Sequence, residues 1–313
     1  MSVLKLFDGH CDTLSRCLNA GEGIRENSGQ LDLTRTGIFA PYAQFFAIYA
    51  DADAVEGPLW GEFARQHRFF QKQMERNGDL AVPCRTAEEA ARAARAGKAA
   101  AFLSVEGAEL LECSPERLEQ AHGLGVRAVN LVWNHQNALS GSNADAPERG
   151  LTPLGVRFVE RAQALGVLVD VSHLSEPGFW DVAACAQKPF FASHSDAKAV
   201  WDHKRNLTDA QFTAIIKCRG VAGLNFYADF LGRDPDVDTV LGHAEHFLAL
   251  GGERSLSIGG DWDGCDRLPK GISGVVDLEK LWERMLQKNY HESMIEDIFY
   301  NNLMRVVSEV CTM

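Results

Sequence analysis

Leu4-Lys5-Leu6-Phe7-Asp8-Gly9-His10-Cys11-Asp12 is a largely apolar stretch near the start of this 313-residue chain, and it ends in the pattern His-x-Asp. Its apolar beginning is typical of a buried β-strand. Because side chains alternate along a strand, His10 and Asp12 are expected to point to the same side at its C-terminal end. An imidazole nitrogen and a carboxylate oxygen placed in this way could bind one divalent metal ion together.

Similar apolar runs recur along the chain and alternate with helical patterns, which is typical of a parallel sheet covered by helices. Eight such units predict an α/β fold of the (β/α)8 TIM-type barrel, whose usual length of about 250 residues leaves room for insertions. An open, doubly wound sheet is the structural alternative. The predicted strands are Leu4 to Asp12, Tyr42 to Ala50, Ala99 to Glu106, Val126 to Trp133, Gly166 to His173, Pro189 to Ser195, Gly220 to Tyr227 and Ser255 to Asp263.

Helix start signals lie between these runs. Thr86 with Glu89 and Thr208 with Gln211 each match a capping box, and Ser114-Pro115 and Thr152-Pro153 each place an N-cap residue before a proline. No proline-rich linker, charge block or internal repeat divides the chain, so we expect one domain over residues 1–313. The segments 20–37 and 59–77 are expected to be insertions in the barrel.

Four further predicted strands end in a residue that can bind a metal ion. Glu106, His173, His194 and Asp261 join His10 and Asp12 as this set. In a barrel the C-terminal strand ends meet on one face, where barrel enzymes have their active sites. Imidazole and carboxylate ligands without thiolates suit Zn²⁺, and the number of ligands favours two ions that share one carboxylate. The sequence therefore predicts a metallohydrolase.

The bulk composition excludes several other classes of protein. A net charge of −12 argues against nucleic acid or an anionic membrane as the main partner. Neither a signal peptide, nor a spanning segment, nor an anchor tail is expected. The eight cysteines contain no Cys-x-x-Cys pair and suit buried thiols, so we expect a cytoplasmic protein.

Five short motifs in this order resemble the membrane (renal) dipeptidase family, peptidase family M19, a branch of the amidohydrolase superfamily. They are His-x-Asp at His10, Ser-Val-Glu-Gly at Glu106, Asp-Val-Ser-His at His173, Ser-His-Ser at His194 and Gly-Gly-Asp-Trp-Asp-Gly at Asp261. The resemblance runs from about Leu6 to the segment Asn302-Leu303-Met304-Arg305-Val306, which is nearly the whole chain.

The resemblance implies a zinc-dependent dipeptidase of the bacterial, unanchored type. It implies two zinc ions per subunit, with His10 and Asp12 on the first ion, Glu106 bridging, and His173 and His194 on the second. The substrates would be small dipeptides, including L-Xaa-D-Xaa, which are attacked by a hydroxide held between the ions.

Further family residues match at the predicted strand ends. The resemblance assigns the proton shuttle to Asp261, whereas spacing alone leaves Asp263 equally possible. It places His135 at the scissile carbonyl, Arg205 at the substrate's terminal carboxylate and Tyr227 in the pocket wall.

Other interpretations remain open at this point. Another amide or ester hydrolase of the amidohydrolase superfamily, such as an N-acyl amino acid hydrolase or a lactonase, would use the same metal residues. A non-catalytic zinc-binding scaffold is a third possibility, although it would not require Asp261 or Arg205. His243 and His246 lie one helical turn apart and are read as a solvated helix face. A homodimer is possible and is not determined by the sequence.

Overall fold

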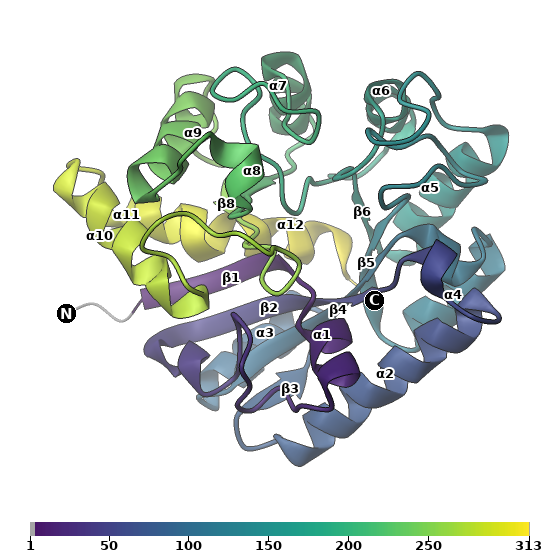
Figure 1. Ribbon diagram of the computed structural model, residues 1–313, viewed down its shortest axis with the longest axis horizontal. Coiled ribbons are helices and arrows are strands. Elements are labelled where there is room, and N and C mark those ends of the chain that lie inside the picture. Colours follow the sequence, from purple (N-terminus) through teal and green to yellow (C-terminus); the bar gives the residue numbers. More distant parts are fainter. Residues whose placement is uncertain (1–3, 313) are drawn as a thin grey trace.

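The computed structural model describes residues 4–312 and shows a curled parallel sheet surrounded by helices (Figure 1). All strand pairs are parallel, and the order along the sheet is β6-β5-β4-β2-β1-β8-β7, with β3 paired to β4 alone. The strands are β1 (Leu4–Cys11), β2 (Phe39–Tyr49), β3 (Ala81–Pro83), β4 (Ala99–Glu106), β5 (Val126–Asn130), β6 (Leu168–Asp170), β7 (Ala222–Leu224) and β8 (Leu256–Ile258).

Residues 191 and 192 close this sheet into a barrel. Phe191 forms a single parallel bridge with Asp170 at the end of β6, and Ala192 forms one with Ala222 in β7. The sheet therefore returns on itself, which confirms the predicted TIM-type barrel and excludes the open, doubly wound alternative.

The predicted strand Pro189 to Ser195 is wrong as a regular strand, because it forms only these bridges. The carbonyl oxygen of Ser193 lies against β7 and the end of β8, where a Cβ atom on Gly223 or Gly259 would be only 2.0 or 1.7 Å from it. Glycine at both positions allows the backbone of residue 193 to cross the barrel so closely. The strands β5 to β8 are also shorter than expected, and β3 was not predicted.

The helices lie around the strands (Figure 1). They are α1 (Thr13–Ala20), α2 (Leu59–Arg76), α3 (Ala87–Arg95), α4 (Pro115–Gly123), α5 (Pro153–Leu165), α6 (Glu176–Cys185), α7 (Asp209–Lys217), α8 (Ala228–Leu231), α9 (Val237–Ala249), α10 (Leu278–Gln287), α11 (Glu292–Glu296) and α12 (Asn302–Val310). Short 3₁₀ turns cover Arg35–Ile38, Ala52–Ala54, Ala108–Leu111 and Val275–Asp277, and a π-helical turn, Asp297–Asn301, precedes α12.

The predicted helix starts are present at α3, α4, α5 and α7. Thr208 and Gln211 form the full capping box at α7. At α3 only half of the predicted box forms, because Glu89 accepts from the Arg85 amide instead of the Thr86 amide. Within residues 4–312, none of the helices combines the length and the apolar character needed to cross a membrane.

An aromatic cluster fills the barrel interior. The ring of Phe7 stacks on those of Phe45 and Phe102, with centroids 5.6 and 5.3 Å apart. Apolar side chains of α12, such as Leu303 and Val306, belong to the same buried cluster. The interior is therefore a packed core, and the polar site residues lie at the C-terminal ends of the strands.

Candidate metal centre and active site

Six predicted site residues meet at the C-terminal face of the barrel. His10 and Asp12 lie at the end of β1, and Glu106 is the last residue of β4. The others follow the shorter strands: His173 comes after β6, His194 after the bridge at residue 192, and Asp261 after β8. Chain segments far apart in sequence thus bring imidazoles and carboxylates into contact.

His10 is surrounded by carboxylates. Its Nε2 atom is 3.4 Å from Glu106 Oε2, 3.5 Å from Asp12 Oδ2 and 3.9 Å from Asp261 Oδ1. Although His10 and Asp12 are both buried, His10 Nε2 and Asp12 Oδ1 have no hydrogen-bond partner among the described residues. Buried polar atoms without partners are costly, so these two atoms are suited to bind a cation.

His173 and His194 face each other through their Nε2 atoms, which are 3.0 Å apart. Glu106 Oε1 lies 3.0 Å from the first and 3.6 Å from the second. The Nδ1 atom of His173 is 3.0 Å from the side-chain oxygen of Asn134, an acceptor, so Nδ1 carries the proton and Nε2 presents a lone pair.

Ser193 fixes the His194 ring in the same way. Its hydroxyl oxygen is 2.6 Å from His194 Nδ1, and Asp170 accepts hydrogen bonds from the Ser193 side chain and amide. Because a carboxylate only accepts, the serine hydroxyl donates to Asp170 and accepts the Nδ1 proton of His194. Both Nε2 lone pairs then point toward Glu106, an arrangement that a cation would stabilise.

Asp8 is a further buried carboxylate beneath the site. It accepts hydrogen bonds from the Trp262 indole at 2.7 Å and from the Gly260 and His10 amides at 3.0 Å each. These bonds join the end of β1 to the segment after β8 and so hold His10 and Asp261 on neighbouring backbones. Sequence reasoning missed this role, because Asp8 looked like one polar residue in an apolar strand.

Burial shifts the pKa values of several groups in this site toward the uncharged form. Burial raises the pKa of Glu106 to about 7, although the nearby His10 lowers it. Burial also raises the pKa of Asp261. Burial lowers the pKa of His173 and of His194, so both rings stay neutral and able to bind metal. The donor set therefore fits one or more hard-to-borderline metal ions.

A cavity of about 390 Å³ lies over this cluster. Arg205 and Tyr227 line it, together with Asp12, Glu106, His173 and Asp261. Its other lining residues include Tyr49, Trp133, Asn134 and Phe230, which sequence reasoning did not identify as site residues. Tyr49 is the last residue of β2, Trp133 and Asn134 lie in the loop after β5, and Phe230 lies in α8.

Arg205 is a buried cation at the edge of this cavity. Its side chain donates one hydrogen bond of 3.4 Å to the His194 carbonyl, while its Nε atom has no partner among the described residues. The guanidinium lies 5.4 Å over the ring of Phe230. Within residues 4–312 no carboxylate comes within 4 Å of it, so this charge is available to an anionic ligand.

His135 lies apart from this cavity. Its ring is 40% exposed, with Nε2 3.4 Å from Asp51 and Nδ1 3.8 Å from Asp53. The strand β5 ends at Asn130, so alternation does not extend to residues 131–135. As a result the side chain of Asn134, and not that of its neighbour His135, contacts His173.

The side chains of the two acids after β8, Asp261 and Asp263, lie in different surroundings. Asp261 accepts a hydrogen bond of 3.0 Å from the Asn225 side chain inside the cavity. Asp263 instead accepts from Thr13 and from the Gln30 amide, each at 2.7 Å. Asp261 and Asp263 have φ values of 58° and 68°, so the strand has ended and alternation no longer relates them.

A closed parallel barrel with buried imidazoles and carboxylates at the C-terminal strand ends defines a metallohydrolase of the amidohydrolase type. A profile of the membrane dipeptidase family, peptidase family M19, matches residues 1–313. The chain belongs to this family.

Relatives and solved structures agree with this membership. Dipeptidase tcpJ of Claviceps purpurea is 30% identical over 299 residues, which are 91% of this chain and 70% of that protein. A Schizosaccharomyces pombe protein described as an uncharacterized dipeptidase is 32% identical over 211 residues, which are 66% of this chain and only about half (52%) of the relative.

Two solved structures superpose on nearly the whole chain. A metallo peptidase from Rhodobacter sphaeroides, bound to a phosphinate mimic of L-Ala-D-Ala, has a TM-score of 0.90 and 28% identity over 99% of this chain and 100% of its own. Dipeptidase AC, a family M19 metallo peptidase, has a TM-score of 0.89 and 30% identity with full coverage of both chains.

Proposed function

We propose that this protein hydrolyses the peptide bond of dipeptides, including L-Xaa-D-Xaa, at a centre of two zinc ions. The observation that carries the proposal is the pair of His173 and His194 Nε2 lone pairs directed at Glu106, beside an unpartnered His10 Nε2. The L-Ala-D-Ala mimic bound to the Rhodobacter sphaeroides relative supports the choice of substrate.

The metal ligands would be divided between two positions. His10 and Asp12 would hold one ion, His173 and His194 the other, and Glu106 would bridge them. When bound, such ions supply an activated water and a positive charge for the developing oxyanion. The buried His-carboxylate contacts described above support this division.

Asp261 would move the proton in the reaction. Its carboxylate lies beside His10 and is oriented by Asn225, and burial raises its pKa, which favours proton uptake. It would take the proton of the attacking water and give it to the leaving amine.

Arg205 would bind the free carboxylate of the substrate. Its buried guanidinium at the cavity edge, with no carboxylate within 4 Å among residues 4–312, can make a two-pronged contact with a carboxylate. This contact would restrict substrates to those that end one residue beyond the scissile bond. Tyr227 would form part of the pocket wall, and burial raises its pKa to about 12, so its hydroxyl stays protonated.

The assignment of His135 to the scissile carbonyl stays a prediction. Its ring contacts Asp51 outside the cavity, so it could reach a substrate only if the segment 131–135 moved. Asn134 already lines the cavity and is the nearer polar group of this segment.

The decisive experiment combines a metal count with a substrate panel. Purified, metal-replete protein should contain two ions per chain by elemental analysis, and it should cleave free dipeptides but cleave dipeptide amides poorly. Arg205→Ala should lower kcat/KM for free dipeptides by roughly ten- to a hundredfold, because a charge-assisted contact is lost, while the amides should be almost indifferent to the change.

Equal hydrolysis of the amides by the parent enzyme would favour the alternative, an N-acyl amino acid hydrolase, lactonase or related amidohydrolase. Metal binding without hydrolysis of any amide or ester would favour a zinc-binding scaffold. A single bound ion under metal-replete conditions would contradict the binuclear centre.

We also propose a cytoplasmic location, supported by the eight cysteines, all of them free thiols. A homodimer is a further proposal, and light scattering of the purified protein tests it.

A further inference from the structure

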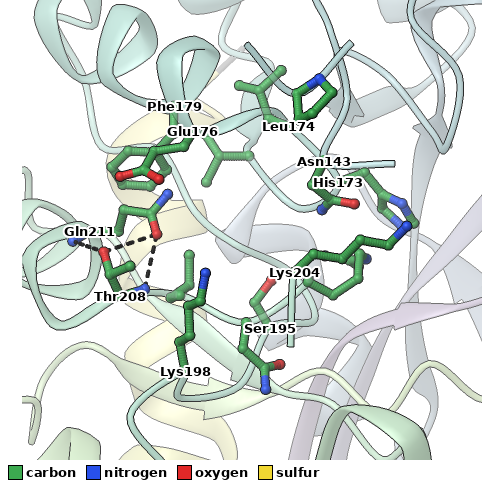
Figure 2. A pocket seen from close by; sticks show the side chains of 15 residues that line it. Asn143, His173, Leu174, Glu176, Phe179, Ser195, Lys198, Lys204, Thr208 and Gln211 are labelled. Carbon is green, nitrogen blue, oxygen red and sulfur yellow. Dashed lines mark hydrogen bonds between the residues drawn. The ribbon is translucent and has the colours of Figure 1, made fainter. Parts of the chain in front are cut away.

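A second, smaller cavity of about 170 Å³ opens beside the metal centre (Figure 2). Its lining residues come from the segments after β5 and β6, from α6 and from residues 195–211. His173, Lys204 and Arg205 line both this cavity and the larger one over the metal cluster. The two cavities therefore meet at these three side chains.

The position of Arg205 makes the smaller cavity relevant to the substrate. If its guanidinium binds the terminal carboxylate, the side chain on the same α-carbon starts at the junction of the two cavities. The scissile carbonyl must lie over the metal cluster in the larger one. The smaller cavity has room for about five or six water molecules, which suits a short side chain.

The smaller cavity has a cationic wall. Lys198 and Lys204 reach it on one side, and Glu176 and Phe179, at the start of α6, lie on the other (Figure 2). Lys198 has a distant partner in Asp202 at 3.7 Å. Lys204 has no carboxylate within 4 Å among residues 4–312, in a chain whose net charge is −12.

We propose that this cavity receives the side chain of the C-terminal residue of the dipeptide and that Lys204 makes the enzyme prefer an acidic side chain, aspartate or glutamate, at that position. The inference rests on the proposed dipeptidase function, since it assumes that Arg205 binds the terminal carboxylate. Lys204 is then a specificity-determining residue, and Glu176 opposes it from the facing wall.

The test compares substrates of the same shape and different charge. L-alanyl-glutamate and L-alanyl-glutamine, each with a D and an L C-terminal residue, differ only by carboxylate and amide. For the better stereoisomer, the parent enzyme should favour glutamate by about fivefold to tenfold in kcat/KM, the size expected for a partly solvated charge pair. This preference should shrink at high salt.

The variants separate Lys204 from general charge effects. Lys204→Gln should bring the glutamate-to-glutamine ratio close to one, Lys204→Arg should keep most of it, and Glu176→Gln should increase it. Lys72→Gln, on the exposed face of α2 and away from both cavities, makes the same charge change and should leave the ratio and the activity unaltered.

Failure of the Lys204 proposal and failure of the proposed dipeptidase function give different results. Cleavage of dipeptides with a ratio that Lys204→Gln does not change, or with glutamine preferred by the parent enzyme, overturns this inference and leaves the dipeptidase function intact. Absence of hydrolysis of every dipeptide by the metal-loaded enzyme overturns the proposed function and this inference with it.

Discussion

At the scale of single residues, the backbone conformation and the hydrogen-bond partners decide where Asp261 and Asp263 lie. Asp261 lies in the cavity because its backbone has left the strand, and Asn225 orients its carboxylate. Asp263, two residues later, accepts hydrogen bonds from the Thr13 side chain and from the Gln30 amide. The same chemical group thus lies in two different environments that spacing in the sequence could not distinguish.

The change Asp261→Asn removes the proposed proton carrier and keeps the shape of the side chain. We expect kcat to fall by at least about a hundredfold, the low end for general acid–base groups, while two ions per chain remain bound. Asp263→Asn is the matched control and should cost stability with kcat nearly unchanged. If Asp261→Asn kept near-normal turnover, another group would have to carry the proton.

Ser193 is expected to affect metal binding through the orientation of the His194 ring. Ser193→Ala removes the acceptor that holds the Nδ1 proton of His194, so the ring loses its fixed orientation. We expect a loss of about tenfold or more in zinc affinity, measured by competition with a chromogenic chelator. Ser193→Thr keeps the hydroxyl and should restore most of the affinity.

Ser104→Ala is the matched control for this measurement. Ser104 is buried in β4, and its hydroxyl has no hydrogen-bond partner in the described structure. Its removal should leave zinc affinity unchanged. An equal loss in both variants would mean that the effect is general loosening of the barrel.

Among the helices, α9 shows how packing overrides a polar pattern. His243 and His246 were read as a solvated helix face, and for His243 this is wrong because it is fully buried. Its Nδ1 accepts from the Ala197 amide at 3.1 Å and its Nε2 donates to the Leu231 carbonyl at 3.0 Å. The neutral ring joins α9 to the loop after residue 195 and to α8.

His243 should make stability depend on pH. Burial lowers its pKa in the folded protein from the ordinary value of 6.5, so the unfolded chain takes up a proton first as the pH falls. The free energy of unfolding from urea titration should therefore decrease as the pH drops below about 6.5. His243→Gln should flatten this part of the profile, and an unchanged slope would assign it to other groups.

For the whole molecule, the metal centre should stabilise the fold. Chelated protein keeps several buried carboxylates close together, whereas bound ions offset their charge, so Tm should fall on chelation and return with added Zn²⁺. A ligand at a hundred times its Kd stabilises the folded state by about 2.7 kcal/mol. A Tm that is independent of metal would contradict a buried metal centre.

The same binding should weaken in acid. Burial raises the pKa of Glu106 to about 7 in the metal-free site, so a proton competes with the ion near and below neutral pH. Zinc affinity should therefore fall as the pH decreases through 7. A flat pH profile would indicate that Glu106 is not a ligand.

The sequence by itself favoured the barrel class and predicted which imidazoles and carboxylates meet at the C-terminal strand ends. Alternating apolar runs and helices predict a parallel sheet covered by helices, and residues that end its parallel strands lie at the same edge of the sheet. The capping residues of α4, α5 and α7 were also predictable, because they depend on local hydrogen bonds.

Only the tertiary structure decided what lies beyond the strand ends. The extent of the segment 189–195, the choice of Asn134 over His135, and the roles of Asp8 and Ser193 depend on contacts between distant residues. Local periodicity ends where each strand ends, and left-handed residues such as His173 and Asp261 then redirect the side chains. Close packing at the barrel face, such as that of Gly223 and Gly259 on Ser193, fixes the remaining geometry.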